Sequence, residues 1–209
     1  MPKNVYIHIP FCKSKCKYCS FISFPKLDLK EAYVKALLQE INNRYKGEKL
    51  NTLYFGGGTP SLLTEKEFEK ILKCFNSDEN TEITTELNPE TITLDYLKKL
   101  NNLGFNRLSF GCQTFNEKIL KIIGRQHSPK DVENSVKLAF QAGFKNVSLD
   151  FIYGLPEQKI KDFELDLKRA ISLDIQHISL YGLKISENCF FYNHPPKNLP
   201  DEDTQADMY

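Results

Sequence analysis

Residues 5–19 read Val5-Tyr6-Ile7-His8-Ile9-Pro10-Phe11-Cys12-Lys13-Ser14-Lys15-Cys16-Lys17-Tyr18-Cys19. The apolar run at the start of this stretch predicts a buried strand, and a loop with three cysteines follows it directly. A dinucleotide-binding fold would instead have a G-x-G-x-x-G turn at this place. This stretch therefore distinguishes between two parallel-sheet folds, the doubly wound sheet and the barrel, with both of which the rest of the chain is compatible.

The rest of the chain alternates short β-rich runs with longer stretches of helical periodicity. Because each crossover helix returns the chain to the same edge of the sheet, this alternation predicts an α/β fold with a parallel sheet. Six such units form either an open doubly wound sheet or an incomplete barrel, and without the glycine-rich turn we predict a partial (β/α)6 barrel. The candidate strands are Val5–Ile9, Thr52–Phe55, Ile83–Leu87, Arg107–Phe110, Val147–Phe151 and Ile178–Tyr181.

Local signals mark the helices between these strands. Ala32–Tyr45 carries apolar residues at helical spacing. Thr64 followed by Glu67 predicts a capping box at a helix start. Leu103–Phe110 and Ala142–Leu149 resemble each other, and each reads as a helix end, a glycine turn and a buried strand. This internal echo supports a repeated strand–helix unit.

The composition is that of a folded protein without a strongly charged partner. Of the 209 residues, 41% are hydrophobic and 26% are charged, and 28 lysines and arginines nearly balance 27 aspartates and glutamates. A net charge of +1 gives no electrostatic reason to expect nucleic acid or an anionic membrane as the main partner. No run approaches the roughly 20 apolar residues of a transmembrane segment, and the first residues lack the apolar core of a signal peptide. We therefore expect a cytoplasmic protein.

The chain length suits one sizeable domain. We predict that residues 1–185 form the barrel and that residues 186–209 form a linker and the start of a truncated C-terminal domain. Pro200-Asp201-Glu202-Asp203 has acidic residues suited to a helix N-terminus. The chain then stops at Tyr209, about two turns into that expected helix.

Three of the six cysteines form a C-x3-C-x2-C motif at Cys12, Cys16 and Cys19. In a reducing compartment such spacing favours metal ligands or redox groups over structural disulphides. Three thiolates from one loop can each hold one iron of a [4Fe–4S] cubane, which leaves the fourth iron open to a small chelating ligand. A structural zinc site needs four ligands, and the nearby His8 lies in the strand rather than in the loop. A redox disulphide would more often use C-x-x-C alone and leaves the third cysteine unexplained.

Glycines and polar residues follow the other predicted strands. Gly56–Pro60 follows the second strand, and glycines let the backbone approach a ligand closely. Glu86, Gln113 and Asp150 lie at the ends of the next three strands. Since the carboxyl ends of barrel strands meet on one rim, we expect these residues to share a pocket with the cysteines.

The cysteine motif resembles the signature of the radical S-adenosylmethionine enzymes, C-x3-C-x-Φ-C, with Tyr18 as the aromatic Φ. The resemblance implies a partial six-stranded radical SAM barrel, a [4Fe–4S] cluster, and S-adenosylmethionine bound to the open iron through its amino and carboxylate groups. It also implies that an electron from the reduced cluster cleaves the sulphonium to methionine and a 5′-deoxyadenosyl radical. The part left to the protein is to orient the cofactor and to exclude oxygen and water.

The order of the motifs resembles the oxygen-independent coproporphyrinogen III oxidase family over nearly the whole chain, to about Tyr181. The matching segments are Tyr6–Cys12, Phe55–Pro60, Gly104–Ser109, Gly111–Gln113 and Asp150–Pro156. In the decarboxylating enzyme of this family, Gln113, Arg125 and Asp150 correspond to a second S-adenosylmethionine site. The resemblance implies cofactor-ligand roles for Tyr6, Tyr18, Gly57, Gly58, Thr59, Glu86, Gln113, Arg125 and Asp150.

Two departures from the decarboxylating enzyme favour its haem chaperone relatives, the HemW-type branch. Phe21 occupies the position of a fourth cysteine, and only five residues precede Tyr6, where that enzyme has a long N-terminal extension. Pro200–Tyr209 also resembles the sequence that leads into the C-terminal domain of this branch. The resemblance implies delivery of haem to haemoproteins. The nearest alternative is the oxidase of porphyrin biosynthesis, and a structural zinc-binding module is a distant one.

The expected partners follow from the same resemblance. They are haem or a porphyrin, a flavodoxin-like electron donor and a haemoprotein acceptor. Lysines in the cysteine loop can attract an acidic reductase or haem propionates; they are Lys13, Lys15 and Lys17. The candidate haem-iron ligands, none of which the sequence singles out, are His8, His127, His177 and His194.

Overall fold

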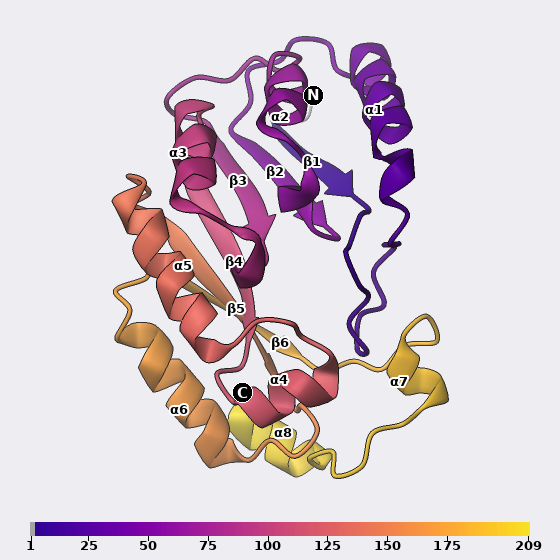
Figure 1. Cartoon of the computed structure of the whole chain (residues 1–209), viewed down its shortest axis with the longest axis vertical. Helices are drawn as coiled ribbons and strands as arrows, with labels where there is room; N and C mark the ends of the chain where they lie inside the picture. Colours follow the sequence, from indigo (N-terminus) through magenta and orange to yellow (C-terminus); the bar gives the residue numbers. More distant parts are fainter. Residues whose placement is uncertain (1–2) are drawn as a thin grey trace.

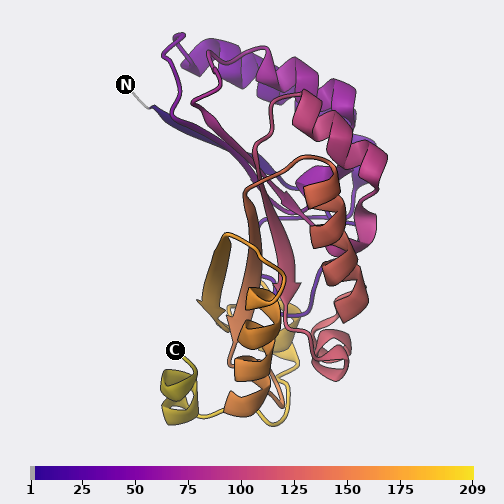
Figure 2. The same cartoon turned by 90° about the vertical axis from the view of Figure 1, so that its left-hand side faces the viewer.

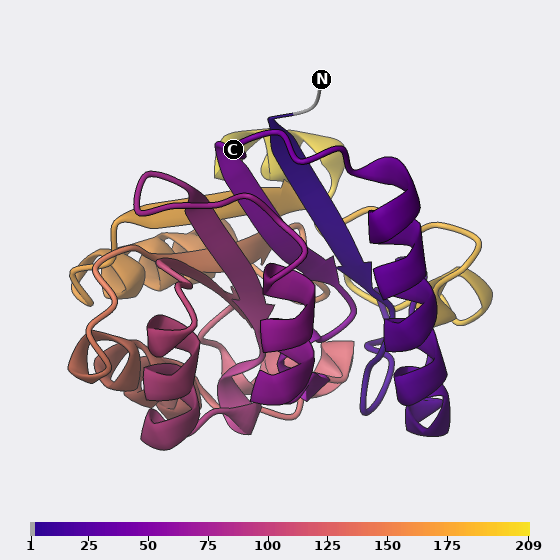
Figure 3. The same ribbon diagram turned by 90° about the horizontal axis from the view of Figure 1, so that it is seen from above.

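Six parallel strands form a sheet with the sequential order β1-β2-β3-β4-β5-β6. The computed structural model describes residues 3–209. A doubly wound sheet would reverse its strand order partway, so the sequential order agrees with the predicted partial (β/α)6 barrel. Figure 3 shows the strands from above, with helices outside them. The strands are β1 (Asn4–Ile9), β2 (Thr52–Gly57), β3 (Glu82–Leu87), β4 (Arg107–Gln113), β5 (Val147–Tyr153) and β6 (His177–Gly182).

The longer helices cover the outer face of this sheet (Figures 1 and 2). One α-helix joins each pair of successive strands, except that two α-helices lie between β4 and β5. The helices are α1 (Lys30–Arg44), α2 (Glu65–Leu72), α3 (Leu94–Asn102), α4 (Glu117–Ile123), α5 (Pro129–Gln141), α6 (Ile160–Ile171), α7 (Phe190–Asn193) and α8 (Glu202–Met208). Three short 3-10 helices are η1 (Leu27–Leu29), η2 (Pro60–Leu62) and η3 (Pro89–Thr91).

The two faces of the sheet differ in polarity, because side chains alternate across each strand. The residues that face the helices are apolar and fully buried, as Leu53, Phe55 and Leu108 show. The alternate positions, such as Tyr54 and Ser109, carry polar groups that are hydrogen bonded to carboxylates. Parallel sheets are usually apolar on both faces. The polar inner face therefore marks the side of this sheet on which a polar ligand can bind.

The local signals in the sequence form the expected structures. Thr64 and Glu67 make the predicted capping box, with the Thr64 N–H donating to the Glu67 carboxylate at 2.7 Å. α1 buries three apolar residues of its predicted face. Gly104 and Gly143 have φ values of +97° and +98°, a left-handed conformation that favours glycine. The internal echo is thus confirmed as two equivalent helix–turn–strand junctions.

β2, β4 and β5 are longer than predicted. The prediction that Gly56 and Gly57 follow the second strand is wrong, because they still pair with β1 and end β2. β4 and β5 continue past Phe110 and Phe151 for the same reason, since Gln113 pairs with β5 and Tyr153 with β6. Asp150 therefore lies within β5, where it pairs with Ser179, and the prediction that it ends this strand is wrong. Its side chain still lies on the inner face, because the alternation of side chains along β5 is as expected.

The C-terminal segment packs against the barrel. Phe191 of α7 is 3% exposed and Met208 of α8 is 6% exposed. Asp201 caps α8 by accepting the Thr204 N–H at 2.8 Å, as the acidic start of this helix predicted. The domain boundary at residue 185 stays a prediction. Among residues 3–209, every helix is too short or too polar to cross a membrane.

Candidate functional site

The three motif cysteines lie in a loop that leaves the C-terminal end of β1. The neck of the loop is closed by backbone hydrogen bonds from Cys12 N to Phe24 O (3.3 Å) and from Phe24 N to Pro10 O (2.9 Å). A tight turn joins the other two cysteines, with Cys19 N donating to Cys16 O at 3.1 Å. All three are free thiols and half-buried. Burial raises the pKa of the Cys19 thiol, which would have to lose its proton to bind iron.

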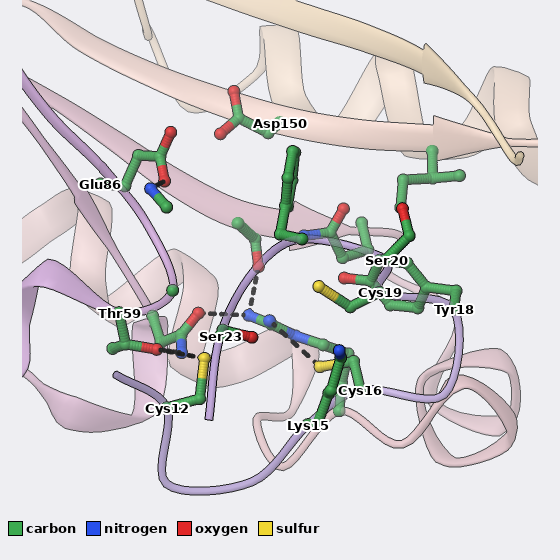
Figure 4. A pocket seen from close by; sticks show the side chains of 18 of the residues that line it. Cys12, Lys15, Cys16, Tyr18, Cys19, Ser20, Ser23, Thr59, Glu86 and Asp150 are labelled. Carbon is green, nitrogen blue, oxygen red and sulfur yellow. Dashed lines mark hydrogen bonds between the residues drawn. The ribbon is translucent and has the colours of Figure 1, made fainter. Parts of the chain in front are cut away.

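These cysteines line a cavity of about 340 Å³ at the C-terminal ends of the strands (Figure 4). That volume lies at the small end of the usual range for small-molecule sites. The structure brings together eleven of the twelve predicted site residues here. They are Cys12, Cys16, Tyr18, Cys19, Gly57, Gly58, Thr59, Glu86, Gln113, Arg125 and Asp150.

Tyr6 is the predicted residue that does not line the cavity. Its side chain is 55% exposed and stacks on Tyr54 with the ring centroids 5.8 Å apart. Its hydroxyl lies 3.2 Å from Nδ1 of His8. Tyr6 thus lies on the inner face of β1, next to the cavity rather than in its wall. None of the four histidines belongs to the cavity lining either.

The glycine loop after β2 is held directly against the cysteine loop. Gly58 N donates to Ile9 O at 2.8 Å, and Thr59 N donates to Phe11 O at 2.7 Å. A Cβ on Gly58 would lie 2.5 Å from the Phe11 carbonyl oxygen, a distance that two such atoms cannot adopt. Glycine is therefore required at this position for close backbone approach, which brings the Thr59 hydroxyl 3.7 Å from the Cys12 sulfur.

Arg125 lines the cavity, and its guanidinium contacts one cysteine directly and a second through two intermediate residues. Its Nη1 lies 3.8 Å from the Cys16 sulfur, and its Nη2 donates to Asn88 Oδ1 at 2.9 Å. Asn88 Nδ2 in turn donates to the Thr59 hydroxyl at 3.1 Å, which is the group that reaches Cys12 (Figure 4). Burial opposes the charge, but nearby Tyr18 and Cys16 raise the pKa of Arg125 further, so it stays cationic. The network thus supplies a hydrogen-bond donor to each of the two sulfurs, Arg125 to Cys16 and Thr59 to Cys12.

Two carboxylates face the cavity from the other side. Glu86 accepts the Tyr54 hydroxyl at 3.0 Å and the Gly57 N–H at 3.1 Å. Asp150 accepts the Ser109 hydroxyl at 3.0 Å. Burial raises the pKa of both carboxyl groups, whereas these hydrogen bonds lower it. The carboxylate oxygens of Glu86 and Asp150 can accept hydrogen bonds from hydroxyl and ammonium groups in the cavity. They also give the cavity a negative potential opposite Arg125.

Gln113 lies where β4 ends in an irregular backbone. Its φ is +68°, unusual for a residue with a side chain, and the pairing with β5 shifts register between Gly111 and Gln113. The next two residues are clamped by the buried Asp166 of α6, which accepts the Thr114 hydroxyl at 2.6 Å and the Phe115 N–H at 2.7 Å. Asp166 therefore holds the end of β4 that presents Gln113 to the cavity.

Asp166 makes stability depend on pH. Burial raises its pKa from 3.8 to about 6, with the hydrogen bonds from Thr114 and Phe115 opposing the shift. The native carboxyl then binds its proton more tightly than the unfolded one, so the free energy of unfolding should fall as pH rises from about 4 to 6, by up to roughly 3 kcal/mol from this group. Urea denaturation at several pH values should show this fall in the wild type and a flatter profile in Asp166→Asn. Parallel profiles of the two proteins would contradict the assignment.

Sequence reasoning missed three residues that support the site. Asn88 links Arg125 to Thr59, and Tyr54 and Ser109 hold the two carboxylates. Tyr54 and Ser109 alternate with buried apolar residues, so the period of two along each strand was a usable signal for an inner face. Asn88 follows β3 directly, at the same rim as Glu86. Its role could be recognised only once the position of Arg125 was known, and Arg125 lies 37 residues away in the chain.

The donors present suit a multi-iron cluster in this site. Among residues 3–209, no three His, Cys, Asp or Glu side chains lie close enough to share one metal ion. A cubane places its irons at separate corners, so three thiolates can each bind a different iron without converging. The hydrogen-bond donors at two sulfurs are of the kind that tunes such clusters.

Residues 6–170 match the family model described as the radical SAM superfamily, well over half of the chain. The chain belongs to the radical SAM superfamily. Membership implies a [4Fe–4S] cluster and S-adenosylmethionine, in agreement with the donors around the cavity. The sequential six-stranded sheet of this radical SAM protein is consistent with the partial barrel expected from the resemblance.

Within this superfamily, the chain is similar to two groups of proteins, as curated relatives and a solved structure show. The haem chaperone HemW of Bacillus subtilis is 40% identical over 99% of this radical SAM chain and 58% of its own length. HemW of Lactococcus lactis is 37% identical over 100% of the chain and 57% of its own length. The radical SAM enzyme coproporphyrinogen III oxidase (HemN) from Escherichia coli superposes with a TM-score of 0.89 at 31% identity, over 99% of this chain and 50% of its own. The chain thus spans somewhat more than half the length of the curated relatives it matches.

Proposed function

We propose that Cys12, Cys16 and Cys19 bind one [4Fe–4S] cluster with an open iron that takes S-adenosylmethionine. The observation that carries this proposal is the joint lining of one cavity by the three thiols, the glycine loop and the strand-end polar residues. The cluster, when bound, supplies an electron to the sulphonium of the cofactor. Everything else in the cavity serves binding and orientation.

The protein's own groups have distinct parts in this proposal. Gly57 and Gly58 bring backbone groups close to the methionine moiety, while Glu86 and Asp150 accept hydrogen bonds from ammonium and ribose hydroxyl groups. Their negative charge also favours a cationic sulphonium. Gln113 adds an amide to the same wall, and Tyr18 packs beside the cysteines. Tyr6 can reach the cofactor only from the inner face of β1.

We further propose that the full-length protein is a haem chaperone of HemW type, acting in the cytoplasm, where closely spaced thiols stay reduced. The support is the identity of 40% to a HemW protein across nearly the whole chain, and Phe21 in place of a fourth cysteine. Haem is then the cargo, a haemoprotein the acceptor, and a flavodoxin-like protein the electron donor. The exposed Lys13 and Lys15 beside the cluster loop offer positive charge to such an acidic donor.

Coproporphyrinogen III oxidation is the second candidate function. It is favoured by the TM-score of 0.89 to an enzyme that catalyses it, although the sequence identity of 31% is lower than the identity to HemW. The two candidates share the cluster and S-adenosylmethionine. They differ in the fate of the tetrapyrrole, because the chaperone transfers haem unchanged and the oxidase decarboxylates coproporphyrinogen III.

Anaerobic reconstitution tests the shared part of the proposal. We expect about four irons and four acid-labile sulphides per chain. The electron paramagnetic resonance spectrum of the reduced cluster should change when S-adenosylmethionine is added, because the cofactor occupies the open iron. A colourless protein free of labile sulphide would overturn the proposal.

The full-length protein then separates the two candidates. It is supplied with reductant, S-adenosylmethionine and coproporphyrinogen III, and in a parallel sample with haem. We expect stable haem binding and transfer to an apo-haemoprotein without release of carbon dioxide. Carbon dioxide release with formation of protoporphyrinogen would establish the oxidase instead.

A further inference from the structure

The short helix α7 touches the middle of the cysteine loop, far from it in sequence. Lys17 lies between Cys16 and Cys19, and its carbonyl oxygen accepts the Phe191 N–H at 3.0 Å. On its other side, Lys17 N donates to Ile123 O at the end of α4, also at 3.0 Å. Figure 1 shows the tip of this loop between α4 and α7. The segment between the second and third cysteine is therefore held from two sides.

The side chain of Phe191 anchors α7 in this position. It is 3% exposed and belongs to a second hydrophobic cluster, separate from the main core. The neighbouring Phe190 and Tyr192 are 49% and 50% exposed, so Phe191 makes the buried contact of this helix. Tyr18 of the cysteine motif packs against the same cluster. The other buried members are Ile119, Leu120, Ile123, Ile152, Leu155 and Cys189.

We propose that Phe191 is a positioning residue for the iron–sulphur cluster. Its buried ring fixes α7 on α4, which places the Phe191 N–H against the Lys17 carbonyl and holds in place the turn that carries Cys16 and Cys19. The inference rests on the proposed function, because it requires that the thiols hold a cluster. It also extends the cofactor-binding unit beyond residue 185, into the segment that the sequence assigned to a linker.

The physical reason is that a ligand-bearing loop binds a cluster tightly only when its geometry is set before binding. The tip of the cysteine loop is hydrogen bonded to other elements on both sides, through the N–H and the carbonyl of Lys17. Without the ring of Phe191, the buried anchor of α7 in this cluster is reduced to the small side chain of its N-cap residue, Cys189. The Lys17 carbonyl then loses its donor, and the turn from Cys16 to Cys19 is free to move.

The chain offers a matched pair of variants, because two phenylalanines stand side by side in α7. Phe191→Ala removes the buried ring, and Phe190→Ala removes a half-exposed ring of the same size, which contacts the loop weakly through the Lys17 ammonium 5.9 Å from its centroid. Both are made in the full-length protein, loaded anaerobically, and exposed to an iron chelator. We expect iron loss about 10-fold faster or more in Phe191→Ala, a typical cost of losing a group that orients metal ligands, and no more than about twofold faster in Phe190→Ala. Phe191→Leu, which keeps an apolar side chain, should restore most of the retention.

Hydrogen exchange separates positioning from general stability. Protection should fall in the peptide that contains residues 12–24 and stay unchanged in β4. Equal iron loss in the two alanine variants would overturn the inference. So would a loss of protection in β4 of Phe191→Ala, because the ring would then serve the whole fold. A wild-type protein that takes up no iron would instead overturn the proposed function.

Discussion

Replacing Cys16 with alanine is expected to remove most of the iron that the anaerobically reconstituted protein binds. With three thiolates, three corners of the cubane have protein ligands; with two, a second iron is left open and the cluster is lost readily. The Cys16 sulfur is also the one that Arg125 contacts directly, at 3.8 Å, so the substitution removes this contact together with the ligand. Iron and sulphide analysis, together with the visible absorption of the cluster, measures the effect.

Cys74→Ala is the control for this experiment. Cys74 is also a half-buried free thiol, but its sulfur donates to Lys70 O, outside the cavity lining. Its replacement should leave the iron content unchanged. If Cys16→Ala retained its full iron content, the ligand assignment would be wrong. Tight binding of one zinc per chain in place of the cluster would favour the structural zinc module.

Replacing Arg125 with methionine is expected to lower the reduction potential of the cluster. The reduced cluster carries one more negative charge than the oxidised one, and a nearby cation stabilises the reduced form. A charge-assisted hydrogen bond is worth about 1.5–3 kcal/mol, which corresponds to roughly 60–130 mV for one electron. The variant also removes the donor that Asn88 Oδ1 and Gly111 O share, at 2.9 and 2.8 Å.

Redox titration followed by electron paramagnetic resonance measures the potential, and Arg125→Lys is the matched control. Lysine keeps the positive charge but cannot reproduce the fork of the guanidinium, so its potential should lie closer to that of the wild type. The family resemblance assigns Arg125 to the cofactor instead. An unchanged potential in Arg125→Met with weakened S-adenosylmethionine binding would support that role over the one expected here.

The longer strands show where pattern reasoning reaches its limit. The predicted strand cores are correct, because alternating or continuous apolar runs report burial locally. Their ends are set by whether a neighbouring strand still offers a partner, which explains the extra residues of β4 and β5. The left-handed φ of Gln113 had no local signal, since only the clamp from Asp166 on another helix accounts for the backbone there.

Arg125 illustrates the same limit within the site. As a lone arginine between α4 and α5, nothing in its neighbourhood distinguishes it from a surface residue. In the structure its guanidinium contacts the sulfur of Cys16, which lies 109 residues earlier in the chain. Phe190 and Phe191 are indistinguishable by composition, and only the packing shows which of them is buried.

The cysteine spacing, the glycine loop, the strand–helix alternation and the helix caps were all readable from the sequence, because each depends on residues within about one turn or one loop of each other. Tertiary structure alone decided which side chains meet around those motifs: Arg125 at Cys16, Asn88 at Thr59, and Phe191 under Lys17. Such contacts join elements far apart in the chain, and their partners follow from how the barrel closes and packs rather than from any local pattern.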